Sequence, residues 1–352
     1  MSEQAGAVSA IDAAVTVIFA ALTSAGLIVL LYPLLKRYAL AKPNARSSHH
    51  VPTPQGGGIA VVAATVAAVG GALGLLPLGV SLNVPLGAVL GAAVLTACLG
   101  AADDIRPLPV APRLLLQAIV VAAVIFSLPD QLRVLPLLPW WLERFLIMLG
   151  GLWFVNLVNF MDGIDWMTVA EVVPLAAGLA AMGAIHALPT YGTIVALALG
   201  GAMLGFAYFN RPIARLFLGD VGSLPIGLLL GWLLLLLAGD GHLIAAVIMP
   251  LYYLADATIT LVRRLSRGEL VWQSHRTHFY QLATDRGFSV IEIVARVFIV
   301  NVALCALAIM TVVAPGKLAD IAAAGGGAAL VGLLLTAFAR GRTFRKDRAA
   351  SS

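Results

Sequence analysis

Residues 222–238 read GSLPIGLLLGWLLLLLA, a stretch without a charged side chain. A helix that crosses a bilayer needs about 20 consecutive, predominantly apolar residues, and this stretch with its flanks meets that length. The rest of the chain could not cover such a run with polar surface, because 61% of its 352 residues are hydrophobic and 11% are charged. Soluble domains contain about 45–50% apolar and about 25% charged residues. The composition therefore excludes a soluble globular protein, a disordered chain and a nucleic-acid-binding protein.

Comparable apolar stretches recur along the whole chain. They predict an all-α, polytopic integral membrane helical bundle with about 11 transmembrane helices. We see no internal repeat, so residues 1–352 are interpreted as a single membrane-embedded domain that ends in a basic tail, 340–352. The predicted spans are 14–35, 57–76, 84–101, 113–128, 143–159, 167–187, 190–209, 222–238, 243–262, 291–313 and 319–339.

The placement of lysine and arginine orients this bundle. If the N-terminus lies outside and the spans alternate, all but three of the 22 basic residues fall on one side. Basic residues accumulate on the cytoplasmic side of membrane proteins, so this side is predicted to be the cytoplasm. The acidic and amide-rich segments fall on the same side. We therefore expect cytoplasmic loops to form an active site at the membrane surface.

The first cytoplasmic loop, KPNARSSHHVPTPQGGG at 42–58, combines cations with a glycine-rich helix start. Backbone amides at a helix N-terminus can approach an anion closely, and glycines leave room for it. Lys42, Arg46 and His49 are therefore candidate phosphate ligands. The alternative is an ordinary basic cytoplasmic loop followed by glycines that begin a helix.

Adjacent acids occupy the end of the third span. Asp103 and Asp104 repel each other and are costly at a membrane edge unless a cation or a metal lies nearby. Arg113 follows ten residues later, where the fourth span begins. A pair of solvated loop acids is the alternative interpretation.

A second polar segment, NLVNFMDGID at 156–165, follows the fifth span. Asn156 and Asn159 are three residues apart and therefore share one helix face, and Asp162 and Asp165 come directly after them. Amide and carboxylate oxygens are hard ligands that suit Mg²⁺ better than Zn²⁺. The segment therefore predicts a magnesium site; a helix cap, the alternative, would explain one aspartate but not the whole cluster.

Two further segments carry ionisable groups. In FLGDVGS at 217–223, Asp220 lies near two glycines and is either a metal ligand or a helix cap. In HRTHFYQ at 275–281, an arginine between two histidines favours phosphate binding. A zinc site is disfavoured, because Cys98 and Cys305 both lie in apolar stretches.

Asp256 lies inside the ninth predicted span. Ionisable residues within membrane spans are usually functional, so Asp256 is a functional candidate. Pairing with Arg263 or Arg264, two turns further on, is the structural alternative.

In their order along the chain, the five polar segments resemble those of the membrane polyprenyl-phosphate N-acetylhexosamine-1-phosphate transferases, glycosyltransferase family 4. The resemblance implies transfer of an N-acetylhexosamine 1-phosphate from a UDP-sugar to undecaprenyl phosphate, with release of UMP. It also implies Mg²⁺ as the cofactor, with Mn²⁺ as a substitute, and a bacterial inner membrane. The product would start an O-antigen, exopolysaccharide or other cell-envelope glycan.

The resemblance also implies roles for individual residues. Asp220 and Asn159 would bind the metal. Substrate would contact Lys42, Arg46, His49, Asn156, Asp162 and Asp165. The catalytic positions would be Asp103, Asp104 and Arg113 at the reacting phosphates, and His275, Arg276 and His278 at the sugar diphosphate.

The chain departs from the family pattern at three positions. Trp166 stands where many relatives have a glycine, and Tyr280 and Gln281 replace histidines of the cytoplasmic loop. The missing histidine-rich loop argues against a muramoyl-pentapeptide substrate. Because a hydroxyl and an amide can bond sugar groups without charge, we expect Tyr280 and Gln281 to influence donor choice.

A secondary transporter of an anionic solute is the alternative function. Transporters place their binding groups near the bilayer midplane, on broken helices of repeated halves. The ionisable groups here are predicted at the cytoplasmic ends of the spans instead, which favours the enzyme.

Overall fold

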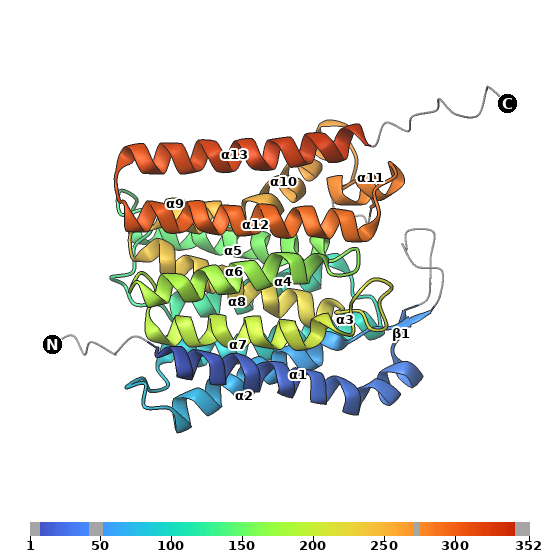
Figure 1. Cartoon of the computed structure of the whole chain (residues 1–352), viewed down its shortest axis with the longest axis horizontal. Helices are drawn as coiled ribbons and strands as arrows, with labels where there is room; N and C mark the ends of the chain where they lie inside the picture. The colour runs from blue at the N-terminus through green and yellow to red at the C-terminus, as the bar shows by residue number, and fades with distance from the viewer. Residues whose placement is uncertain (1–7, 42–51, 271–274, 342–352) are drawn as a thin grey trace.

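The computed structural model describes residues 8–41, 52–270 and 275–341. In these residues the fold is an all-α bundle of long helices that run along one common direction (Figure 1). Nine of the described helices are long and apolar enough to cross a membrane. These nine are α1 (Ala10–Tyr38), α2 (Gly57–Leu75), α3 (Val84–Ile105), α5 (Trp140–Met161), α6 (Met167–Ala184), α7 (Thr190–Ala207), α8 (Asp220–Gly239), α12 (Val290–Val313) and α13 (Lys317–Arg340).

The remaining elements are shorter. Helix α4 (Val110–Phe126) is apolar but has fewer residues than the nine. Helix α11 (Phe279–Asp285) precedes α12, and β1 (Leu40–Ala41) pairs antiparallel with β2 (Thr53–Pro54). Ten of the eleven predicted spans each coincide with one helix, which confirms the polytopic helical fold.

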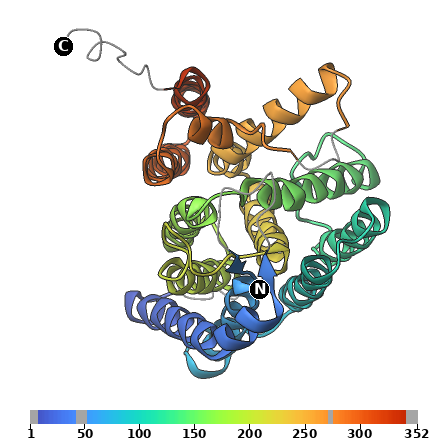
Figure 2. The same ribbon diagram turned by 90° about the vertical axis from the view of Figure 1, so that its right-hand side faces the viewer.

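The ninth predicted span, 243–262, is not one continuous helix. It is divided into α9 (Leu243–Ile248) and α10 (Leu251–Ser266). The break includes Pro250, which lacks the backbone N–H that a continuous helix would use. Helix α10 then leans outward from the bundle (Figure 2). The prediction of an unbroken span was therefore wrong at this point.

Helix α8 is the centre of the bundle. It packs against α2, α3 and α5, while α1 packs on α7 and α6 on α12. Figure 2 shows α12 and α13 on one side of the bundle and α1 on the opposite side. Because α8 is surrounded, almost all of its spanning residues are buried.

Three charged residues, Arg133, Glu143 and Arg144, link the connection between α4 and α5 to these two helices. Buried Arg144 donates to the carbonyl oxygens of Ile125 and Pro129 at the C-terminus of α4, at 3.3 and 2.8 Å. Glu143 accepts the amide of Val134 at 2.6 Å and pairs with Arg133. These bonds attach the connection between α4 and α5 to the end of α4 and the start of α5.

Glycines allow three helix ends to meet at the opposite end of the bundle. A side chain at Gly58 of α2 would lie 2.1 Å from the Cα of Gly222 in α8. One at Gly100 of α3 would lie 2.3 Å from the carbonyl oxygen of Asp220. Direct backbone contact therefore brings α2, α3 and α8 together at the end of the bundle where β1 and α11 also lie (Figure 1).

Candidate functional site

The polar segments converge at this end of the bundle. Helices α3 and α5 end there, and α8 begins there. The nearest residues of the three helices are joined by hydrogen bonds that bridge more than 50 positions of sequence. We describe the site from α8 outward.

Asp104 caps the N-terminus of α8 from a neighbouring helix. Its Oδ1 accepts the backbone N–H of Asp220, and its Oδ2 accepts that of Val221, both at 3.1 Å. Gly219 has a left-handed φ of 77°, and a Cβ there would lie 2.6 Å from Asp104 Oδ2. A helix N-terminus is positively polarised, so a carboxylate is favoured at this position. Both Asp104 oxygens are thus already engaged by backbone amides.

Asp103, the next residue, lies in a different environment. Its Oδ2 is 2.6 Å from Nη1 of Arg113, and its Oδ1 accepts the N–H of Leu108 at 2.6 Å. The same Arg113 nitrogen is 3.9 Å from Oδ2 of Asp220. One guanidinium of α4 therefore bridges an acid of α3 and an acid of α8.

Asn159 completes the surroundings of Asp220. Its amide nitrogen donates to Asp220 Oδ1 at 2.8 Å and to the Ser223 hydroxyl at 2.9 Å. The Asp220 side chain is 27% exposed, whereas that of Asp103 is 9% exposed. Asp220 is therefore the more accessible of the two carboxylates that Arg113 bridges.

The residues present here fit a divalent cation. Carboxylate and amide oxygens of Asp220, Asp103 and Asn159 are the hard donors that Mg²⁺ prefers. Two carboxylates share one guanidinium, so Arg113 leaves them with a net negative charge that a cation would offset. No group of three or more acids, histidines or cysteines in the described residues forms a complete metal cage. Substrate oxygens would have to supply the remaining ligands, as is usual for Mg²⁺.

Asp162 follows the end of α5 and faces the same region. It accepts a hydrogen bond from the Thr168 hydroxyl of α6. The pKa of Asp162 is raised to about 7, mainly by burial; the bond from Thr168 opposes this rise, and the charges of Asp104 and Asp165 add to it. Asp162 can therefore gain or lose a proton near neutral pH. Thr168 was not singled out by the sequence.

Asp165 and Asn210 hold two loops together. The carboxylate of Asp165 accepts the N–H of Ala214 at 2.9 Å and is almost fully buried. Asn210 accepts the N–H of Trp166 at 2.8 Å and donates to the Leu216 carbonyl at 2.9 Å. This geometry favours a structural role for Asp165 over the expected contact with substrate. Asn210 lies outside the motifs, and no sequence signal marked it.

The surroundings of Trp166 explain how the chain accommodates a tryptophan at one departure from the family pattern. Its φ is 62°, a left-handed conformation that glycine adopts without steric cost. The indole Nε1–H donates to the Ala207 carbonyl at 2.6 Å, and the backbone N–H is held by Asn210. Hydrogen bonds from both the indole and the backbone thus hold a tryptophan in a conformation that favours glycine.

Residues 275–281, which we call the histidine loop, pack directly on the loop that contains Asp162. The Tyr280 hydroxyl donates to the Phe160 carbonyl at 3.1 Å, and a Cβ at Gly163 would lie 2.0 Å from that hydroxyl. Tyr280 is fully buried, and burial raises its pKa well above the ordinary value. Gln281 accepts the N–H of His278 at 3.4 Å. The expected direct contact of Tyr280 and Gln281 with a sugar is therefore not favoured by the structure.

The other loop residues are closer to the surface. The ring of His275 lies edge-on to that of His278, with centroids 4.9 Å apart. Arg276 is 26% exposed and lies 3.6 Å from Asp285. Lys42, Arg46 and His49 lie outside the described residues.

The amides of the glycine-rich helix start are already occupied. Gly57 N–H donates to the Phe217 carbonyl and Gly58 N–H to the Leu218 carbonyl, both at 2.9 Å. Gln55 donates to the Asp104 carbonyl at 3.1 Å. The expected approach of an anion to these amides is therefore not supported, because the glycines serve close packing instead.

Asn156 points away from Asp220 and its amide donates to Gln117 of α4 at 2.8 Å. It also lines an apolar groove of about 350 Å³ between α4, α5 and α10. Arg113 forms part of the same groove, and Leu114 and Leu149 are exposed along it. The groove therefore connects the guanidinium at the acids with the exposed apolar surface of α4 and α5. Its other lining residues are Val110, Leu152, Trp153, Phe160 and Leu261.

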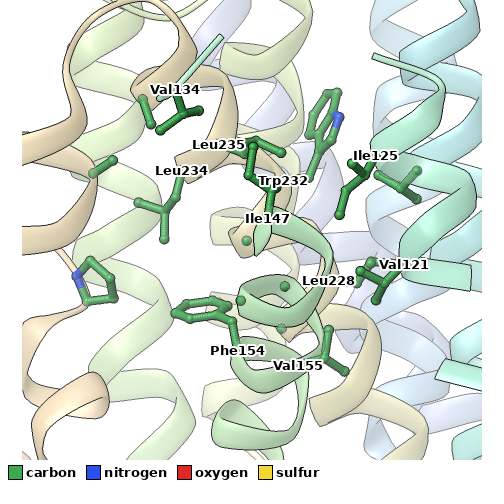
Figure 3. Close-up of a pocket in the computed structure, with 18 of the residues that line it drawn as sticks. Val121, Ile125, Val134, Ile147, Phe154, Val155, Leu228, Trp232, Leu234 and Leu235 are labelled. Carbon is green, nitrogen blue, oxygen red and sulfur yellow. The ribbon is translucent and has the colours of Figure 1, made fainter. Parts of the chain in front are cut away.

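A second cavity, of about 250 Å³, lies deeper between α4, α5, α8 and the broken span (Figure 3). Figure 3 shows Val121, Phe154, Leu228 and Trp232 around it, and none of its lining residues is ionisable. It does not include any residue of the acidic cluster. We assign no chemistry to it.

Comparison with known proteins points to one family. Residues 86–238 match the model of glycosyl transferase family 4, and this range contains Asp103, Asp104, Arg113, Asn159 and Asp220. A protein of Bacillus subtilis (strain 168), described as a probable undecaprenyl-phosphate N-acetylglucosaminyl 1-phosphate transferase, is 27% identical over 300 residues. That alignment covers 78% of this chain and 79% of the relative.

Other relatives are phospho-N-acetylmuramoyl-pentapeptide-transferases. The protein of Psychrobacter cryohalolentis is 30% identical over 174 residues, which are 44% of this chain and 45% of the relative. That of Gluconacetobacter diazotrophicus is 31% identical over 175 residues, 44% of this chain and 47% of the relative. The chain thus aligns with less than half the length of these pentapeptide transferases.

Proposed function

This chain belongs to glycosyl transferase family 4, and we propose that it transfers an N-acetylhexosamine 1-phosphate from a UDP-sugar to undecaprenyl phosphate. The products would be a polyprenyl-diphospho-sugar and UMP. The reaction would be the first membrane step in the synthesis of an O-antigen, an exopolysaccharide or another cell-envelope glycan. We place the chain in a bacterial inner membrane, with the acidic cluster at the cytoplasmic surface.

The observation that carries this proposal is the position of Arg113. Its guanidinium bridges Asp103 and Asp220, and it also lines the apolar groove that opens between α4, α5 and α10. A substrate with an anionic head and a long apolar tail fits this combination, because the head can pair with Arg113 while the tail stays in the groove. A polyprenyl phosphate has this chemistry.

The second substrate is also anionic, so charge neutralisation is central to the reaction. Asp220 and Asn159, with Asp103 nearby, would hold Mg²⁺, which would offset charge on the diphosphate and on the leaving UMP. Arg113 would hold the acceptor phosphate, and Arg276 and His275 would bond the diphosphate of the donor. Asp104 would act through α8, by holding Asp220 in place.

We favour direct in-line attack by the lipid phosphate. The second pKa of a phosphate monoester is about 6, so the acceptor is mostly a dianion at neutral pH and needs little help from a base. Asp103, held by Arg113, would orient the attacking phosphate. A covalent phosphoryl-aspartate intermediate is the alternative route.

A transporter would need its ionisable groups near the middle of the membrane. Asp103, Asp162 and Asp220 instead lie at or beside the ends of α3, α5 and α8. The enzyme is therefore the better-supported function.

The test is UMP release by the purified protein in detergent, with undecaprenyl phosphate and a panel of UDP-N-acetylhexosamines. We expect Mg²⁺-dependent release with at least one donor. Asp220→Asn should abolish release, whereas Asp240→Asn, an acid at the opposite end of α8, should retain it. Absence of release with every donor, together with solute uptake by proteoliposomes, would favour the transporter.

A further inference from the structure

Asp256 occupies an unusual position in α10. It is fully buried, and its two carboxylate oxygens accept hydrogen bonds from a separate segment of the chain. Oδ1 accepts the N–H of Phe279 at 3.0 Å, and Oδ2 accepts the N–H of Tyr280 at 3.2 Å. These are the first two residues of α11. Asp256 therefore caps α11 from outside, as Asp104 caps α8.

Capping alone does not balance the charge of this residue. Two backbone amides need two accepting oxygens, which a carboxylate supplies, but a buried carboxylate also carries a large desolvation cost unless its charge is paired. The hydroxyls of Tyr252 and Thr260 add further bonds, at 3.1 and 3.4 Å. All four of these donors are neutral, so none of them balances the negative charge. A partner for the charge must be sought elsewhere.

That partner is His278. Its Nδ1 lies 3.2 Å from Asp256 Oδ1, and both side chains are buried. An ionised carboxylate only accepts hydrogen bonds, so Nδ1 carries the proton in this contact. The ring orientation is fixed further by Tyr280, whose ring stacks on it with centroids 5.8 Å apart, and by His275, edge-on.

The opposite ring nitrogen is left available. Nε2 of His278 is buried and has no hydrogen-bond partner among the described residues. Buried polar atoms are rarely left without a partner, so this atom is suited to bond a molecule that enters the site. Both ring nitrogens of a protonated histidine are donors, so with Nδ1–H directed at the carboxylate a second proton on Nε2 would point a charged donor at an anion.

We propose that Asp256 is a positioning residue of the donor site: it holds the Nδ1–H of His278, so that the opposite nitrogen, Nε2, donates its proton in a hydrogen bond to a phosphate oxygen of the UDP-sugar when the ring is doubly protonated. The arrangement resembles an aspartate that orients a catalytic histidine through Nδ1. The proposal deepens the function above and rests on it for the identity of the ligand. The arrangement of Asp256 and His278 itself can be measured without turnover.

Asp256→Asn separates the two tasks of the residue. An asparagine oxygen can still accept one of the two α11 amides, but the amide group cannot provide the negative charge that favours protonated Nδ1. We expect the melting temperature to fall only as far as the loss of one cap bond explains, while turnover falls about 10²–10⁴-fold. The upper end of this range is the loss seen when the aspartate that orients a catalytic histidine is replaced by asparagine. Thr260→Val is the matched control, because it removes one hydrogen bond to Asp256 and leaves the histidine contact intact. It should keep turnover within a few-fold.

A spectroscopic measurement tests the arrangement directly. The full chain, labelled with ¹⁵N-histidine in detergent micelles, gives ring-nitrogen signals, and His278 is assigned by its absence in His278→Asn. In the native chain we expect His278 Nδ1 to be protonated and the Nε2 signal to move when UDP is added. In Asp256→Asn both features should be lost.

Two results would overturn the proposal. One is a native His278 in the neutral form that is protonated on Nε2, and the other is an unchanged His278 spectrum in Asp256→Asn. Equal loss of turnover in Thr260→Val and Asp256→Asn would reduce Asp256 to a structural cap. If the native chain releases no UMP but the UDP-dependent Nε2 shift is present, the proposed reaction fails and the positioning role remains.

Discussion

The carboxylate of Asp104 accepts the backbone N–H of Asp220 at 3.1 Å, across 116 positions of sequence. The accessible acid of the cluster is therefore placed by its neighbour on α3. Asp256 bears the same relation to the histidine loop through Phe279 and Tyr280. In both cases an acid on one helix caps the N-terminus of another: Asp104 of α3 caps α8, and Asp256 of α10 caps α11.

Because Asp104 caps α8 and Asp220 is the accessible acid, we expect a change at Asp104 to lower stability and a change at Asp220 to lower activity. Asp104→Ala should destabilise the protein by about 0.5–2 kcal/mol, the usual effect of removing a helix cap, and lower activity through displacement of Asp220. Asp104→Asn should restore only part of that stability, because its single amide oxygen can accept one of the two α8 amides. Asp220→Asn should leave stability nearly unchanged and abolish UMP release. Thermal unfolding and turnover of the three variants, measured side by side, decide between these roles, and near-normal turnover of Asp220→Asn at saturating Mg²⁺ would remove its assignment as a metal ligand.

Arg113 is expected to offset the negative charge of both substrates. Arg113→Ala leaves Asp103 without its cation and the acceptor phosphate without a donor, so we expect kcat/KM for undecaprenyl phosphate to fall by about 10²-fold or more. Arg113→Lys should recover only part of this, because lysine does not reproduce the planar fork of donors. Arg106→Ala, an exposed cation at the same end of the bundle, is the control and should keep the native value.

The pKa of Asp162 predicts a dependence of stability on pH. Its folded-state pKa is raised to about 7 from an ordinary value of 3.8, so the folded protein binds this proton more tightly than the unfolded chain does. The resulting stabilisation is present below pH 3.8 and is lost as pH rises through about 7. Asp162→Asn stays neutral, so its advantage in melting temperature over the native protein should grow as pH rises. Melting curves without divalent cations check this, and a constant difference between the two proteins would contradict it.

Trp166 offers a test of backbone strain. Trp166→Ala and Trp166→Gly both remove the indole and its bond to Ala207, but only glycine adopts a φ of 62° without steric cost. We expect the glycine variant to be more stable than the alanine variant by about 1–2 kcal/mol. Both should be less stable than the native protein if the indole contacts outweigh the strain. Equal stabilities of the two variants would show that the loop relaxes.

Tyr280→Phe is predicted to leave donor preference unchanged. The hydroxyl is bonded to the Phe160 carbonyl inside the protein, so its loss should cost about 0.5–1.5 kcal/mol of stability and affect all donors alike. Arg276→Ala should also impair every donor, because the diphosphate is common to all. The ratio of kcat/KM between two UDP-N-acetylhexosamines is the measurement. A changed ratio in Tyr280→Phe would return this residue to sugar recognition.

Much of the architecture could be predicted from the sequence. Apolar stretches of span length must become helices in a bilayer, since backbone groups find no other partners there. The order of the polar segments also indicated the family. The break at Pro250 was missed because hydropathy measures apolar length and not hydrogen-bond continuity.

The roles of the individual site residues could not be predicted from the sequence in this way. Asp103 and Asp104 are adjacent in sequence, but neighbouring residues on a helix point about 100° apart. One therefore faces Arg113 of α4 and the other the N-terminus of α8. The sequence by itself determined that membrane helices carry these acids to one end of the bundle. Which acid is a cap and which can take a ligand was decided by tertiary packing, because it depends on which helix end each side chain meets.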